Sequence, residues 1–123
     1  MKHYKPSRVP NREEWLALTQ QERIGLVLKY HREKRILMRE AEFHAALHVL
    51  VEDQVAAGDE LPVDRTVRRL IAEGLDRHQA IHAIIGAMSN NMLEVLRQAR
   101  TPPARYFAEL ETLTAHEYLK SNS

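Results

Sequence analysis

Apolar residues recur every three or four positions along most of the chain, and no stretch alternates strictly between apolar and polar residues. The first spacing is that of one face of an α-helix, whereas strict alternation is typical of a half-buried strand. We therefore predict an all-α fold, a compact bundle of five or six helices in a single domain. The predicted helices span residues 12–17, 20–33, 36–57, 63–73, 77–99 and 102–119.

Helix-capping residues mark several ends of these helices. Asn11, Thr19 and Asp76 each precede a Glu or Gln by three residues, which is the capping-box pattern of a helix start. Gly58 and Gly74 stand where the third and fourth helices should stop, because glycine readily adopts the left-handed conformation that follows a helix. These signals place the boundaries between the third, fourth and fifth helices.

The two ends of the chain lack this periodicity. Residues 1–10 hold two prolines and scattered positive charge, so we expect a flexible, extended N-terminal arm. Residues 11–120 form the predicted helical domain, and residues 121–123 are expected to fray.

The third predicted helix carries His44, His48 and Glu52, each four residues from the next. At about 100° per residue, this spacing stacks the three side chains in one row along the helix. The sector of the two histidines also holds Leu37, Ala41, Val51 and Val55. The opposite sector, which we expect to face solvent, holds Arg39, Glu42, Ala46 and Asp53. The histidines are therefore expected to face the core.

A second pair, His78 and His82, repeats this spacing on the fifth predicted helix. It shares an apolar stripe with Ile85, Met92 and Leu96. Two H-x3-H elements on neighbouring helices can direct four imidazoles to one point, as paired ligands do in helical metal sites. The pattern therefore predicts one buried cluster of four histidines.

Two interpretations of this cluster stand side by side. In the first, His44, His48, His78 and His82 bind a divalent transition metal, and Glu52 is a further ligand or orients a histidine. Imidazole and carboxylate suit zinc, iron, manganese or nickel, and the spacing does not choose among them. In the second, the histidines pair with one another and with neighbouring polar groups in a metal-free network, since a buried polar group without a partner costs about 1–3 kcal/mol.

Composition excludes some kinds of site and partner, but it does not indicate a reaction. The chain has 123 residues, a formal charge of +1 and no cysteine. The charge gives no strong attraction to nucleic acid, and the lack of cysteine excludes thiolate metal sites. The longest apolar runs are too short to cross a bilayer, and the N-terminal residues lack the apolar segment of a signal peptide. We expect a soluble, cytoplasmic protein with no membrane partner.

Three further segments carry a resemblance. The stretch from Trp15 to His31 contains WLAL, ERI and YH; the middle reads HAALHVLVEDQVAAGDELP and VRRLIAEGLDRHQAIHAI; the third segment is LEVLRQARTPPARYFAEL. Together these segments resemble a family of small uncharacterised bacterial helical proteins of unknown function, from about Trp15 to Leu110. The resemblance implies an all-α fold and makes the H-x3-H pairs part of a family pattern. It implies no activity.

Other function classes have weaker support in the sequence. The segment VRRLIAEGLDRHQAI is similar to a helix-turn-helix, with Arg65, Arg68 and Arg69 available for phosphates, but its second helix offers few polar groups for base edges. A structural or protein-interaction module, including a homodimer built on one helix face, is the alternative to a metal protein. No nucleophile setting, phosphate loop or cofactor fingerprint indicates an enzyme.

Overall fold

The computed structural model describes residues 1–33, 41–92 and 103–121, and all regular structure among them is helical. The α-helices are α1 (Arg12–Ala17), α2 (Gln20–Glu33), α3 (Ala41–Ala56), α4 (Val63–Ala72), α5 (Arg77–Asn90), α7 (Ala104–Thr112) and α8 (Ala115–Ser121). A short 3-10 helix, η1 (Gly58–Glu60), lies between α3 and α4. The all-α prediction is confirmed, although seven α-helices in the described ranges exceed the five or six expected.

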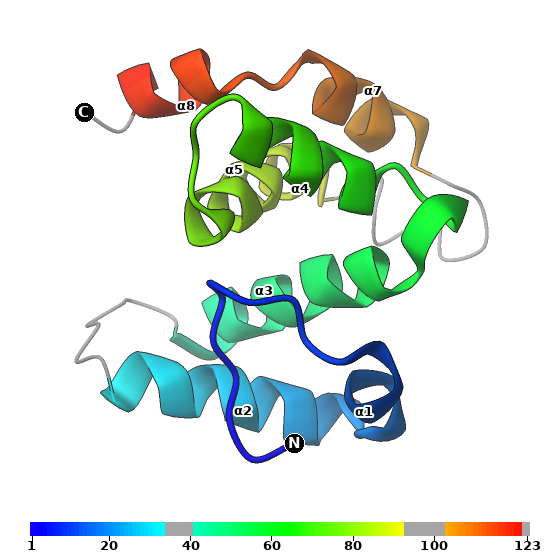
Figure 1. Ribbon diagram of the computed structural model, residues 1–123, viewed down its shortest axis with the longest axis vertical. Helices are drawn as coiled ribbons and strands as arrows, with labels where there is room; N and C mark the ends of the chain where they lie inside the picture. The colour runs from blue at the N-terminus through cyan, green and yellow to red at the C-terminus, as the bar shows by residue number, and fades with distance from the viewer. Residues whose placement is uncertain (34–40, 93–102, 122–123) are drawn as a thin grey trace.

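Helix α3 runs through the middle of the molecule (Figure 1). On one side it contacts α1 and α2, and on the other it contacts α4 and α5. Helix α7 packs against α4 and α5 on the side away from α3. Because α3 is covered from two sides, its side chains face protein in more directions than those of an ordinary surface helix.

Two apolar clusters lie on the two sides of α3. The smaller cluster consists of Tyr4, Trp15, Val27, Ala45 and Val49. The larger one, which includes most of the buried part of α5, consists of Leu47, Val51, Val55, Val63, Val67, Leu70, Leu75, Ala80, Ile81, Ala83, Ile84, Ile85, Ala87, Met88, Tyr106, Leu110 and Ala115. Helix α3 contributes residues to both clusters and so joins them.

The capping boxes predicted at Thr19 and Asp76 are present, and the one predicted at Asn11 is formed by half. The Thr19 hydroxyl accepts a hydrogen bond from the Glu22 backbone N–H at 3.1 Å, and the Glu22 carboxylate accepts one from the Thr19 N–H at 2.9 Å. Asp76 and Gln79 form the same reciprocal pair at the start of α5. The Asn11 side chain accepts a bond at the start of α1. Each cap satisfies backbone donors that have no partner inside the helix, which fixes where these helices begin.

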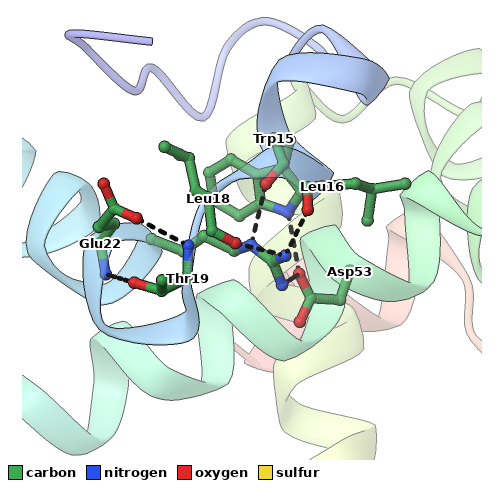
Figure 2. A network of polar contacts seen from close by, with 7 residues as sticks. Trp15, Leu16, Leu18, Thr19, Glu22 and Asp53 are labelled. Atoms are coloured by element: carbon green, nitrogen blue, oxygen red, sulfur yellow. Dashed lines mark hydrogen bonds and ion pairs between the residues drawn. The ribbon is translucent and has the colours of Figure 1, made fainter.

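One side chain of α3 contradicts the predicted solvent face. Asp53 lies against the smaller cluster, where it accepts hydrogen bonds from the Trp15 indole N–H and the Arg23 guanidinium, each at 2.9 Å. The same guanidinium donates to the carbonyls of Trp15, Leu16 and Leu18 at the end of α1 (Figure 2). The prediction assumed one buried stripe, but α1 and α2 cover the second face of α3.

The observed helix boundaries confirm some of the predicted ones. The bounds predicted for the first two helices are those observed, and Gly58 has the expected positive φ of 66°. The fifth helix was predicted to run unbroken from residue 77 to 99, but α5 ends at Asn90, because the backbone of Asn91 leaves the helical conformation. Residues 36–40 and 93–99 of the predicted third and fifth helices lie outside the described residues. Helix α3 is the longest in the described ranges with 16 residues, while α5 and α2 have 14 each.

The predicted helix over residues 102–119 is wrong, because two helices replace it. Helix α7 ends before Leu113, whose backbone is extended, and the Thr114 hydroxyl then accepts a hydrogen bond from the Glu117 N–H at 3.1 Å. The Glu73 carboxylate, at the end of α4, accepts a bond from the backbone N–H of Ala115 at 2.9 Å. These bonds start α8 as a separate element. No helix in the described ranges has the length and apolar character to cross a membrane.

Candidate metal centre

Helices α3 and α5 bring all four predicted histidines into one cluster. Within each helix the ring centroids of the pair lie close together, 4.6 Å for His44 and His48 and 4.3 Å for His78 and His82. Between the helices the His48 ring lies 5.1 Å from that of His82 and 5.6 Å from that of His78. His48 is fully buried, and the other three are half-buried. The cluster expected from the spacing is therefore present.

Three of these residues offer nitrogens to a common point. His44, His48 and His82 each have a ring nitrogen within 4.8 Å of those of the other two. Nε2 of His48 lies 3.1 Å from Nε2 of His82. Two nitrogens bound to one zinc ion at about 2.0–2.1 Å lie roughly 3.3–3.4 Å apart at the tetrahedral angle. The His48–His82 separation is within about 0.3 Å of this spacing, and a pair at the 4.8 Å limit would have to approach by roughly 1.4 Å.

His78 lies at the edge of this group. Its ring makes edge contacts with those of His82 and Tyr30, the latter at a centroid distance of 6.0 Å. The Nε2 atoms of His78 and His44 are both buried, so each ring directs this nitrogen into the protein. His78 is therefore placed to support His82 or to approach the same ion as a fourth nitrogen.

Glu52 is next to the cluster but its oxygens are directed elsewhere. The Arg77 guanidinium donates to both oxygens, from Nη2 to Oε1 at 2.7 Å and from Nη1 to Oε2 at 2.8 Å. The Tyr4 hydroxyl donates to Oε2 at 2.7 Å. Glu52 is buried, and the charge of its carboxylate is neutralised by a two-point ion pair. Of the two roles predicted for Glu52, the contacts favour orienting a histidine over binding an ion.

Tyr4 and Arg77 were not among the predicted site residues. The Tyr4 oxygen lies 3.4 Å from Nδ1 of His48, so it connects the histidines to Glu52. Burial, and then the charge of Glu52, raise the pKa of Tyr4 well above 10.0, so the hydroxyl keeps its proton. Burial alone would lower the pKa of Arg77, but its bonds and attraction to Glu52 raise it. One signal for Arg77 was available, since a cation in the first turn of a helix opposes the helix dipole.

The arginines of the helix-turn-helix interpretation have partners on the protein. Arg65 pairs with Glu111 at 3.2 Å, and Arg68 pairs with Asp64 at 3.3 Å. Arg69 donates to two carbonyls at the end of α7. Helix α5, which would be the recognition helix, is buried along much of its length. The contacts of Arg65 and Arg69 join α4 to α7 and to Leu113 at its end, and that of Arg68 lies within α4; none of them supports the nucleic-acid interpretation.

Comparisons with protein-family models, with curated proteins and with solved structures found no match. The resemblance to small bacterial helical proteins is untested by them and stays a prediction. The function proposed below therefore rests on the arrangement of the histidines.

Proposed function

We propose that this protein binds a divalent transition metal ion through His44, His48 and His82. The observation that carries the proposal is the convergence of three ring nitrogens within 4.8 Å, from two helices whose histidines share the i, i+4 spacing. Imidazole ligands without a thiolate suit zinc, iron, nickel and copper, and we take zinc as the probe. Such an ion would join α3 to α5.

The number of ligands bears on what the ion does. Three histidines leave one position of a tetrahedral ion open for water or another small ligand, as in catalytic zinc sites, whereas four protein ligands close the site. His78, whose ring centroid lies 4.3 Å from that of His82, is the candidate for the fourth position. We propose His44, His48 and His82 as the ligands, with His78 packed beside them.

A metal-free polar network is the competing function for the same residues. The 3.1 Å separation between Nε2 of His48 and Nε2 of His82 also suits a hydrogen bond between a protonated and an unprotonated ring nitrogen. In that case the cluster stabilises the contact between α3 and α5, and the protein acts as a structural or interaction module.

Zinc titration of protein purified without a histidine tag separates the two functions. An ion that binds only the folded state stabilises it by mass action, by about 2.7 kcal/mol at a free concentration one hundred times the dissociation constant. We expect zinc to raise the melting temperature of the wild-type protein and to have no effect on the His48→Ala/His82→Ala double variant.

Two single variants complete this test. His116 is exposed on α8, so the His116→Ala variant should keep the full response to zinc. His78→Ala should keep most of the response if three histidines bind the ion, and lose it if His78 is an essential fourth ligand. Wild-type protein that binds no stoichiometric metal, and whose melting temperature zinc leaves unchanged, would establish the metal-free network instead.

Two wider predictions from the sequence accompany this proposal. We propose a cytoplasmic location, consistent with a sequence that has no cysteine. We also propose membership of the bacterial family named above, with the H-x3-H pairs as its shared site. Detection of the native protein in fractionated cells would test the location directly.

A further inference from the structure

The N-terminal segment supplies a residue to the histidine cluster. Tyr4 is 3% exposed, and its ring packs against those of Trp15 and Tyr30 and edge-on to His48, at centroid distances of 5.7, 6.2 and 6.3 Å. Two residues on, the carbonyl of Pro6 accepts a hydrogen bond from Arg77 at 3.0 Å. The segment is thus bound to α3 through Tyr4 and to α5 through Arg77.

The Tyr4 hydroxyl has two polar neighbours, the Glu52 carboxylate and Nδ1 of His48, and it can donate its proton to only one of them. A hydroxyl has one proton, and the Glu52 carboxylate, paired with Arg77 through both oxygens, is an acceptor at 2.7 Å. The proton of Tyr4 is therefore used in the bond to Glu52. The Tyr4 oxygen can then only accept from His48, whose Nδ1 is 3.4 Å away.

A hydrogen bond between Tyr4 and His48 therefore requires the proton of the His48 ring to be on Nδ1. A neutral imidazole carries one proton, so a proton on Nδ1 leaves the lone pair on Nε2. Nε2 is the atom that lies 3.1 Å from Nε2 of His82. Tyr4 thus directs the lone pair of His48 toward the proposed position of the ion, as hydrogen-bonded carboxylates and carbonyls do for metal-binding histidines in general.

We propose that Tyr4 is a positioning residue of the metal site, which fixes the orientation and the tautomer of His48. The chain of contacts runs from Arg77 to Glu52, then to Tyr4 and to His48. This inference rests on the proposed function, because it concerns the strength of metal binding at the same site. It adds that the affinity for the ion depends on a segment outside the two helices that hold the ligands.

The chain offers a matched control for a test by substitution. Tyr106 is also fully buried, and its hydroxyl also donates to a side chain of α3, Gln54, at 2.7 Å. It lies in the larger apolar cluster. Tyr4→Phe and Tyr106→Phe therefore remove the same atom from comparable surroundings, but only the first removes a contact with His48.

Zinc affinity should separate the two variants. Loss of a hydrogen bond to a metal-binding histidine commonly weakens binding by about 10- to 100-fold. We expect a decrease of this size for Tyr4→Phe and a change within about twofold for Tyr106→Phe, measured by competition with a chelator of known affinity. The visible spectrum of bound cobalt should change only in Tyr4→Phe. Equal affinity and equal spectra for Tyr4→Phe and wild type would overturn the role of Tyr4 while leaving the metal site intact.

A measurement on the metal-free wild-type protein tests the inference without any variant at Tyr4. Long-range proton–nitrogen NMR distinguishes imidazoles protonated on Nδ1 from those protonated on Nε2, and the His48→Gln variant identifies the signals of His48. We expect the His48 proton on Nδ1. A proton on Nε2 would overturn the proposal. Wild-type protein that binds no zinc would instead refute the metal function itself, so the two failures are distinguishable.

Discussion

Arg77 is a cation in a position where its own helix disfavours it. It is the first residue of α5, where the helix dipole repels positive charge by about 0.3–1 kcal/mol. Its side chain is nevertheless 5% exposed and pairs with Glu52, whose side chain is 0% exposed. Withdrawing two charges from water is costly, and removal of one partner leaves the other uncompensated. The ion pair, and not the local helix, therefore accounts for an arginine at this position.

Replacement of Arg77 tests whether the ion pair with Glu52 stabilises the fold. Arg77→Met removes the partner of a buried carboxylate, so we expect the free energy of unfolding to fall by about 3–5 kcal/mol. Arg65→Met is the matched control, because Arg65 pairs with Glu111 while both side chains are more than half exposed, and such pairs contribute about 0–1 kcal/mol. Urea unfolding of both variants measures the difference. Equal losses would show that Glu52 does not depend on Arg77.

The sequence predicted part of this site. The i, i+4 spacing placed each histidine pair on one side of its helix, because residues four apart always neighbour each other there. Tyr4 and Arg77 could not be found in this way, since Tyr4 meets His48 across 44 positions and Arg77 meets the Pro6 carbonyl across 71. Periodicity carries no information on such contacts, which depend on how the N-terminal segment packs on α3 and α5.

At the scale of elements, the break between α7 and α8 shows how a helix prediction fails. Apolar spacing continues from Leu110 through Leu113, so the pattern favoured one continuous helix. The sequence T-A-H-E at Thr114 has the form of a capping box, as at Thr19, and was the local signal of a new start. The break is completed from outside the segment, because Arg69 of α4 donates to the Leu113 carbonyl at 2.7 Å.

Glu73 connects α4 to α8, and its charge should make this connection depend on pH. The N–H of Ala115, and then the Arg69 guanidinium, lower the pKa of Glu73 below its ordinary value of 4.5. A carboxyl whose pKa is lower in the folded state stabilises the protein above the unfolded value and loses this effect as the pH falls through the folded value. We therefore expect wild type to exceed Glu73→Gln in stability at about pH 6, and this advantage to shrink toward about pH 3.

Thermal unfolding of both proteins across this range measures the effect. In the wild-type protein the amide signal of Ala115 should also titrate with Glu73, and in Glu73→Gln that titration should disappear. A difference in melting temperature that stays constant from about pH 6 to about pH 3 would contradict the assigned role.

At the scale of the whole molecule, α3 has two buried faces, whereas the sequence pattern predicted one. The helix turns Ala45 and Val49 to the smaller cluster, and Leu47, Val51 and Val55 to the larger one. A single apolar stripe is the usual signature of a surface helix, and it led to the prediction that Asp53 faces solvent. Which polar residues of a helix are covered on a second side depends on the other helices, here α1 and α2 (Figure 1).

The shared helix leads to a prediction about cooperativity. Ile84 is fully buried in the larger cluster, and Ile84→Ala should cost about 2–5 kcal/mol through lost contacts and a cavity. The one tryptophan of the sequence, Trp15, lies in the smaller cluster and reports on the other side of α3. Because α3 belongs to both clusters, we expect Trp15 fluorescence and circular dichroism to give the same lowered urea midpoint in this variant.

The matched control for this experiment is Ile71→Ala, since Ile71 is 41% exposed on α4 and its truncation should cost less than about 1 kcal/mol. If the fluorescence midpoint of Ile84→Ala stayed at the wild-type value while the dichroism midpoint fell, the two sides of α3 would unfold separately. The prediction of a single domain would then be wrong. A loss of about 2–5 kcal/mol from a total of about 5–15 kcal/mol is large enough to make such a separation visible. Coincident midpoints would show that the two clusters, joined by α3, unfold as one cooperative unit.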